Sequence, residues 1–171
     1  YSKAITSSDA IIPNYAEAFG SAEEKVRATG IPRTDIFFDS ENALRVRKRM
    51  IEKYPQMKGK KVILFAPTYR GTRAEDAGYD LEQLDLDSLY RELNEEYFFI
   101  FKWHPAMYNN IIRNKAYSFN TEKYNDFFLD LSSEKDIEEI MLISDILITD
   151  YSSVIFDYYL LDRPVVFFAY D

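Results

Sequence analysis

Cysteine is absent from this chain of 171 residues, which excludes a disulfide framework and thiolate metal sites. Glycine is scarce, with five in all, and neither a P-loop pattern nor a G-x-G-x-x-G pattern occurs. The chain has no apolar run near the roughly 18 residues of a membrane-spanning helix, and we expect no signal peptide from its sequence. A basic surplus is also lacking, because the net charge is −8, so nucleic acid is not an expected partner. Any bound phosphate must be held by local hydroxyls and individual cations.

The residues that are present belong to a folded protein. Hydrophobic residues make up 47%, aromatic residues 16% and charged residues 29% of the chain, which is typical of a globular domain in a cytoplasmic setting. The length favours one domain with a real core. The chain begins at Tyr1 and stops after a strand-like segment that would still need a covering helix, so we interpret it as a fragment.

The pattern changes near residue 40. Residues 1–39 have no regular period, with a strand-like segment at 4–6, a short helix near 14–19 and a Gly/Pro turn or linker at 29–35. Ser40 then caps a helix that runs to about Tyr54. We expect residues 1–39 to be a linker region and residues 40–171 to be one domain.

Strands alternate with helices throughout residues 40–171. The expected helices are 40–54, 85–95, 133–143 (with Ser133 as its cap) and 153–161, and the expected strands are 61–66, 97–103, 126–131, 146–149 and 164–170. Residues 111–117 are ambiguous, and residues 71–80 form a polar, flexible-looking loop. Because the strands are continuously apolar, both their faces are buried. The sequence therefore predicts a Rossmann-like, doubly wound parallel sheet covered by helices.

Polar side chains follow four of the expected strands. In parallel α/β sheets ligands bind outside the carboxyl ends of the strands, so these four groups should converge on one edge. They are Ala66-Pro67-Thr68-Tyr69-Arg70, Lys102-Trp103-His104-Pro105, Ser132-Ser133 and Asp150-Tyr151-Ser152-Ser153.

Three of these residues are candidates for binding phosphate. Ser152 and Ser153 stand at the start of a helix, where hydroxyls and backbone N–H groups favour an anion, although Ser152 or Asp150 would serve equally as a helix cap. Arg70 follows a strand end and can pair bidentately with phosphate oxygens, or it is a solvated loop arginine.

His104 and Asp157 are the remaining candidates. His104 is the only histidine, and its place at the end of a buried strand makes a general acid or a cation on a leaving phosphate as plausible as a structural role. Asp157 lies on an apolar helix, where a carboxylate needs a partner: a ribose hydroxyl, or an ion pair with Arg163 or Lys102. The acidic runs at 92–96 and 134–139 are expected to be solvated helix faces.

Several motifs together give the chain a resemblance. They are Thr29-Gly30-Ile31-Pro32-Arg33-Thr34-Asp35, Phe65-Ala66-Pro67-Thr68-Tyr69-Arg70, Lys102-Trp103-His104-Pro105, and Thr149-Asp150-Tyr151-Ser152-Ser153 followed by Arg163-Pro164 and Phe167-Phe168-Ala169-Tyr170-Asp171. In their order and spacing they cover the chain from about Ser7 to Asp171. On these motifs the chain resembles the CDP-glycerol glycerophosphotransferase family of teichoic acid synthesis.

The resemblance implies a GT-B architecture, with two Rossmann-like domains and an active site between them. Residues 1–39 would then end the amino-side domain, and residues 40–171 would be the carboxyl-side, donor-binding domain, truncated at its end. His104 would be the catalytic histidine on the donor side. Arg70, Ser152 and Ser153 would contact the diphosphate. Asp157, which is often glutamate in relatives, would contact the ribose. Thr68, Lys102 and Asp150 would support them.

The resemblance also implies a reaction and its partners. A polyol hydroxyl would attack the β-phosphorus of a CDP-polyol donor, with no metal or other cofactor. The acceptor would be a lipid-linked teichoic acid bound through the missing domain, and the parent enzyme would be peripheral on the inner face of the membrane. Because the family's second histidine, the proposed base, is absent, the fragment would bind donor without turning it over.

Other interpretations remain open. Another GT-B transferase, using a UDP- or GDP-sugar, would share the fold and the acid before the proline. A receiver domain is disfavoured because paired acids do not follow the first clear strand. A scaffold fragment would bind no nucleotide. The choice between glycerol and ribitol stays open.

Overall fold

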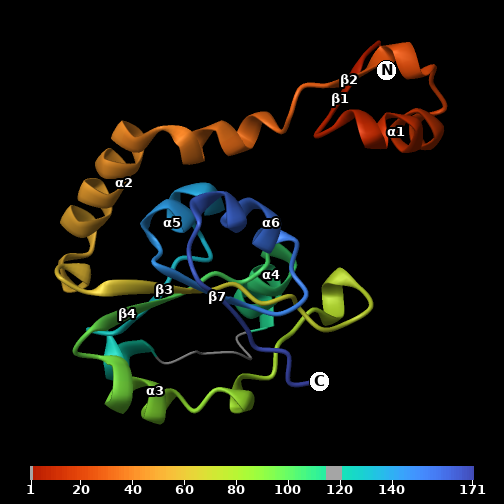
Figure 1. The fold of residues 1–171 in the computed structure, drawn as a ribbon. Coiled ribbons are helices and arrows are strands. Elements are labelled where there is room, and N and C mark those ends of the chain that lie inside the picture. The colour runs from red at the N-terminus through yellow and green to blue at the C-terminus, as the bar shows by residue number, and fades with distance from the viewer. Residues whose placement is uncertain (1, 115–120) are drawn as a thin grey trace. The chain divides into compact units, whose positions relative to one another are not determined.

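The computed structural model describes residues 2–114 and 121–171 (Figure 1). Contacts between residues divide the chain into two compact units, Tyr1–Asp39 and Ser40–Asp171. Each unit is described by itself.

The first unit is small and contains a two-stranded parallel sheet. Strands β1 (Ala4–Thr6) and β2 (Val26–Ala28) pair with Ala4 opposite Val26, and helix α1 (Ile12–Phe19) connects them. Gly20 ends α1 in the left-handed conformation, at φ 58°, that glycine adopts without strain. The strand-like segment and the short helix expected here are confirmed, whereas β2 was not expected because Arg27 interrupts its short apolar run. The turn region continues into a 3₁₀ helix over Pro32–Phe38.

The second unit is built on a five-stranded parallel sheet, with strand order β5-β4-β3-β6-β7. This is the order of a doubly wound α/β fold, so the predicted fold class is confirmed. The strands are β3 (Lys61–Phe65), β4 (Tyr97–Phe101), β5 (Phe128–Asp130), β6 (Ile146–Thr149) and β7 (Val165–Phe167). The central strands are continuously apolar because helices cover both of their faces.

Helices flank this sheet, with α5 and α6 over one face and α3 over the other (Figure 1). They are α2 (Ser40–Lys53), α3 (Leu86–Leu93), α4 (Pro105–Asn114), α5 (Ile137–Ile143) and α6 (Val154–Tyr158). Helix α2 lies along α5, where Lys53 pairs with Glu134 at 2.7 Å and Arg49 pairs with Glu139. The acidic run at 134–139 is thus a face that docks α2, rather than a purely solvated one.

Two helices begin at residues that the sequence did not indicate. Helix α5 starts after Asp136, not after Ser133, because other bonds occupy the preceding turn. Ser132 Oγ accepts the N–H of Trp103, and the Glu134 N–H donates to the Leu131 carbonyl. Helix α4 begins at Pro105 and resolves the ambiguous segment as helical up to residue 114; residues 115–117 of that segment lie outside the described residues.

The core of the second unit is largely aromatic. Phe65 is fully buried at the centre of the sheet, with its ring centroid 5.7 Å from Tyr79 and 5.9 Å from Trp103. Phe99 and Phe101 on the next strand are also fully buried. Burial of one such side chain contributes about 1.5–3 kcal/mol. This core fixes the strand ends, and hence the polar groups that follow them.

The loop at residues 71–80, expected to be flexible, is closed by hydrogen bonds and by packing. The N–H of Arg70 donates to the Gly78 carbonyl at 2.7 Å, and the reverse bond is 2.9 Å. Asp76 accepts the Arg73 N–H at 2.6 Å, and Tyr79 is only 2% exposed. The loop is therefore an ordered extension of the core.

The described part of the chain holds no helix that is both long enough and apolar enough to cross a membrane.

Candidate functional site

The carboxyl ends of β3 and β6 mark the point where the sheet reverses its winding. These two strands are neighbours, and from them the chain winds outward through β4 and β5 on one side and through β7 on the other. Such a switch point opens a crevice above the strand ends. The groups expected to converge on one edge do so, since all of the pairings are parallel.

Asp150 is the most deeply buried acid at this edge, with a side chain that is 0% exposed. Its Oδ1 accepts the N–H groups of Thr68 and Tyr151, each at 2.7 Å, and its Oδ2 accepts Arg70 Nη1 at 2.6 Å. Burial acts to raise the pKa of this carboxyl, but the hydrogen bonds outweigh burial and hold the pKa below its ordinary value. Asp150 thus joins the ends of β3 and β6.

Arg70 is not a solvated loop residue. Its Nε and Nη2 donate to the two carboxylate oxygens of Asp171 at 2.6 and 2.7 Å, and Nη1 also donates to the Thr68 carbonyl. The rings of Tyr79, Tyr151 and Tyr170 surround its guanidinium at 5.4–5.5 Å. The hydrogen bonds to Asp171, and then those to Asp150, raise its pKa. Two carboxylates already balance its charge, so a diphosphate would contact Arg70 only by displacing Asp171.

His104 lies between β4 and α4, with an exposed side chain whose ring is held in place. Its Nδ1 accepts the N–H of Ala106 at 3.2 Å, and its ring centroid is 4.8 Å from that of Tyr69. Because Nδ1 is an acceptor, the neutral imidazole carries its proton on Nε2. The remaining nitrogen is therefore a hydrogen-bond donor, which suits a group that stabilises the charge of a leaving phosphate.

Ser152 and Ser153 precede α6, and capping does not consume their hydroxyls. Ser152 Oγ is 3.4 Å from the Val154 N–H, a long contact, and Ser153 makes no side-chain cap. The helix itself is shorter than expected: α6 ends at Tyr158, and a 3₁₀ turn over Tyr159–Leu161 completes the predicted span. The expected support from a long helix dipole is accordingly reduced.

Lys102 is a buried lysine at the end of β4, 8% exposed. Its Nζ donates to the carbonyls of Ser132 and Glu134 at 3.2 and 2.7 Å, which ties β4 to the loop after β5. Burial lowers the pKa of this ammonium, and the charges of the nearby acids act in the opposite direction. Lys102 supports the site by fixing this loop.

Asp157 is buried in α6, 8% exposed, and is not among the residues that line a pocket with His104. Arg163, one of its two expected ion-pair partners, donates through Nη1 to the Met141, Leu142 and Ser144 carbonyls at the end of α5. The ribose contact of Asp157 stays a prediction.

A pocket of about 240 Å³ lies over the ends of β3, β4 and β6, and we call it the histidine pocket. Its lining residues are Ala66, Pro67, Lys102, Trp103, His104, Pro105, Lys135, Ile137, Ser152 and Val154. Among these described residues none is acidic, although acids outnumber bases in the chain by 29 to 21. The structure thus brings together three predicted residues, Lys102, His104 and Ser152, and adds Lys135, which no sequence signal indicated. Arg70, Ser153 and Asp157 do not line this pocket.

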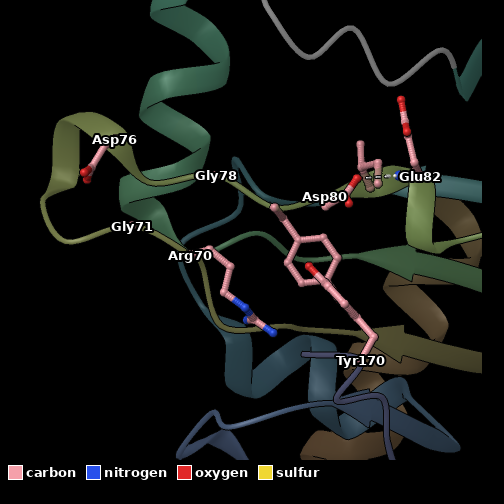
Figure 2. Close-up of a pocket in the computed structure, with 9 residues that line it drawn as sticks. Arg70, Gly71, Asp76, Gly78, Asp80, Glu82 and Tyr170 are labelled. Carbon is pink, nitrogen blue, oxygen red and sulfur yellow. Dashed lines mark hydrogen bonds between the residues drawn. The ribbon is translucent and has the colours of Figure 1, made fainter.

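A second pocket, of about 630 Å³, lies on the other side of Arg70, and Figure 2 shows its lining. We call it the arginine pocket; it is lined by Arg70, Gly71, Asp76, Gly78, Tyr79, Asp80, Leu81, Glu82 and Tyr170. It contains three acids, and its one cation, Arg70, is paired with Asp150 and Asp171. This pocket is unsuited to an anion.

No group of three or more potential metal ligands occurs within the described residues.

Comparison with known proteins places this fold and edge in one family. The family model described as CDP-Glycerol:Poly(glycerophosphate) glycerophosphotransferase matches residues 1–171. The teichoic acid poly(ribitol-phosphate) polymerase of Bacillus spizizenii is 52% identical over the whole chain, which spans 26% of that protein. The teichoic acid ribitol-phosphate polymerase TarL of Staphylococcus aureus is 42% identical, again over the whole chain and 29% of its own length.

A solved structure agrees with the sequence relatives. The wall teichoic acid polymerase TagF matches with a TM-score of 0.79 and 33% identity, over 100% of this chain and 40% of TagF. The chain therefore spans less than half the length of these relatives. The predicted family is confirmed: this chain belongs to the CDP-glycerol:poly(glycerophosphate) glycerophosphotransferase family.

Proposed function

We propose that this chain supplies the donor site of a transferase that moves a polyol phosphate from a CDP-linked donor to a teichoic acid acceptor. The observation that carries the proposal is the histidine pocket, an acid-free pocket at the switch point of a strongly acidic chain. Family membership supports the same reaction class.

In the proposed reaction an acceptor hydroxyl attacks the β-phosphorus of the donor in line. A new O–P bond forms, the bond between the β-phosphorus and the bridging oxygen breaks, and CMP leaves. The His104 Nε2–H donates a hydrogen bond to the departing phosphate. The hydroxyl of Ser152 in the pocket, and that of Ser153 next to it in the sequence, bind the diphosphate. The base that takes the acceptor's proton is supplied from outside this chain, because His104 is the only histidine. No step requires a metal.

The polyol is proposed to be ribitol. The poly(ribitol-phosphate) polymerase of Bacillus spizizenii is 52% identical, whereas the teichoic acid poly(glycerol phosphate) polymerase of the same organism is 40% identical. The acceptor is proposed to be a lipid-linked teichoic acid, with the parent enzyme peripheral on the cytoplasmic face of the membrane.

Calorimetric titration of this chain with CDP-ribitol, CDP-glycerol, CMP and UDP-glucose tests the proposal. We expect the cytidine ligands to bind and UDP-glucose not to bind. Replacing both serines, as Ser152→Ala/Ser153→Ala, should lower the affinity for CDP-ribitol by about tenfold to a hundredfold, because the charged diphosphate loses a hydrogen bond with each hydroxyl.

Ser88→Ala is the matched control, because its hydroxyl bonds only to Asp85 and Arg91 on the surface of α3. Tighter binding of UDP-glucose than of every cytidine ligand would overturn the proposal, and so would equal affinities for the double variant and the unaltered chain.

A further inference from the structure

The cations at the carboxyl edge differ in how much of their charge is free for a ligand. Arg70 is balanced by Asp150 and Asp171. Lys102 is buried, with its ammonium bonded to two backbone carbonyls. A diphosphate carries at least two negative charges, so a site for it needs a cation that is not already engaged.

Lys135 meets that requirement. It lies in the loop between β5 and α5, its side chain is exposed, and it lines the histidine pocket together with His104 and Ser152. Within residues 2–114 and 121–171 no hydrogen bond or ion pair engages its ammonium, whereas its neighbour Glu134 is paired with Lys53 on α2.

The loop that carries Lys135 is fixed rather than free. Lys102 Nζ holds the carbonyls of Ser132 and Glu134, so it anchors the backbone on the amino side of Lys135. Asp136, directly after it, stands at the N-cap position of α5, so Lys135 is the last residue before the helix boundary. The position of Lys135 at the rim of the pocket is therefore set by the same bonds that join β4 to β5.

We propose that Lys135 is a donor-binding residue whose ammonium pairs with the phosphates of the CDP-linked donor, in the pocket that Ser152 also lines. This inference rests on the proposed function. The lysine supplies a point charge and up to three hydrogen-bond donors, without the fixed bidentate geometry of an arginine. It compensates the charge that Arg70 cannot offer while Asp171 is bound to it.

The test compares Lys135→Gln and Lys135→Arg with the unaltered chain, by titration with CDP-ribitol, CMP and cytidine. We expect Lys135→Gln to lower the affinity for CDP-ribitol and for CMP about fivefold to tenfold. The affinity for cytidine, which has no phosphate, should stay within twofold of that of the unaltered chain. Lys135→Arg should restore most of the affinity. The affinity of the unaltered chain for CDP-ribitol should also fall more steeply with salt than that of Lys135→Gln.

Lys58→Gln is the matched control, since Lys58 is exposed near the amino end of β3, opposite the pocket. The inference is overturned if Lys135→Gln binds CDP-ribitol as the unaltered chain does, or if cytidine is weakened as much as CMP. If the serine variants weaken the donor while Lys135→Gln does not, only this inference fails. If the unaltered chain binds no cytidine ligand, the inference and the proposed function fail together.

Discussion

The histidine pocket and the arginine pocket both lie beyond the carboxyl ends of the strands. The larger of the two pockets is the one with less free positive charge. The arginine pocket is the larger, about 630 Å³ against about 240 Å³, but it contains three acids and an arginine held by two carboxylates. The histidine pocket has no acid among its described lining residues. Its Lys102 is held by two backbone carbonyls, and its Lys135 has no partner within the described residues. Free charge, rather than volume or the presence of an arginine, identifies the place for a diphosphate.

The largest expected effect is on turnover in the histidine pocket. His104→Ala should lower turnover of the full-length protein by about 10²- to 10³-fold, because the leaving phosphate loses its hydrogen-bond donor. His104→Gln keeps a hydrogen-bond donor at this position, so its turnover should lie between that of His104→Ala and that of the unaltered protein. Turnover is measured as CMP release from CDP-ribitol in the presence of acceptor.

The control for this prediction lies in the arginine pocket. Glu82→Gln removes one of its acids and should leave turnover within twofold. If Glu82→Gln were as damaging as His104→Ala, the functional contrast between the two pockets would be wrong.

The second effect is on stability and concerns Arg70. Arg70→Met leaves the Asp150 carboxylate buried without its cation, so the free energy of unfolding in urea should fall by about 3 kcal/mol. The affinity for CDP-ribitol should change by less than about threefold, because the guanidinium is occupied by Asp171. A large loss of affinity in the folded variant would instead make Arg70 the diphosphate contact that the sequence predicted.

Acid titration and a surface control sharpen this test. The pKa values of Asp150 and Asp171 are held below their ordinary values, so their stabilising effect is present above about pH 4 and is lost as the pH falls through the folded-state values. Arg70→Met should therefore lose less stability on acidification than the unaltered chain. Arg91→Met, which breaks an exposed pair with Glu92, should cost no more than about 1 kcal/mol at neutral pH.

The smallest expected effect is a loss of stability, without a loss of donor binding, when the loop at residues 71–80 is altered. Gly71 has φ 125°, and a Cβ there would meet the Asp76 carbonyl oxygen at 2.6 Å, so Gly71→Ala should destabilise the chain by about 2–3 kcal/mol. Gly59 has φ 81° with open space around it, so Gly59→Ala should cost only about 1–2 kcal/mol. Both variants should bind CDP-ribitol within twofold of the unaltered chain. A specific loss of binding in folded Gly71→Ala would make the loop part of the donor site.

Much of the fold was predictable because its signals are local. Continuous apolar runs indicated the five strands of the sheet, and an apolar spacing of three and four residues indicated α3. Strand β2 was missed because Arg27 stands between its two apolar residues, so it shows no apolar run. The start of α5 was misplaced because Ser133 lies in a turn that the Glu134 N–H closes on the Leu131 carbonyl, next to Ser132, which accepts a bond from the distant Trp103. That competition is not visible in the residues around Ser133.

The candidate site was predictable in part for a similar reason. His104 and Ser152 were found because each follows a strand end, and parallel strands bring their ends to one edge. Lys135 was missed because it sits within an acidic run that reads as a solvated surface. The neutralisation of Arg70 was also missed, since Asp171 lies 101 residues away in the sequence.

The sequence by itself determined the layered α/β fold, the family and the edge of the sheet where polar groups gather. These follow from burial patterns within each segment and from the shared direction of the strands. Only the tertiary structure decided which charges at that edge are already paired, because pairing depends on distances of a few ångströms between side chains on different segments. That pairing makes Arg70 part of the frame, and it leaves His104, Ser152 and Lys135 facing the pocket.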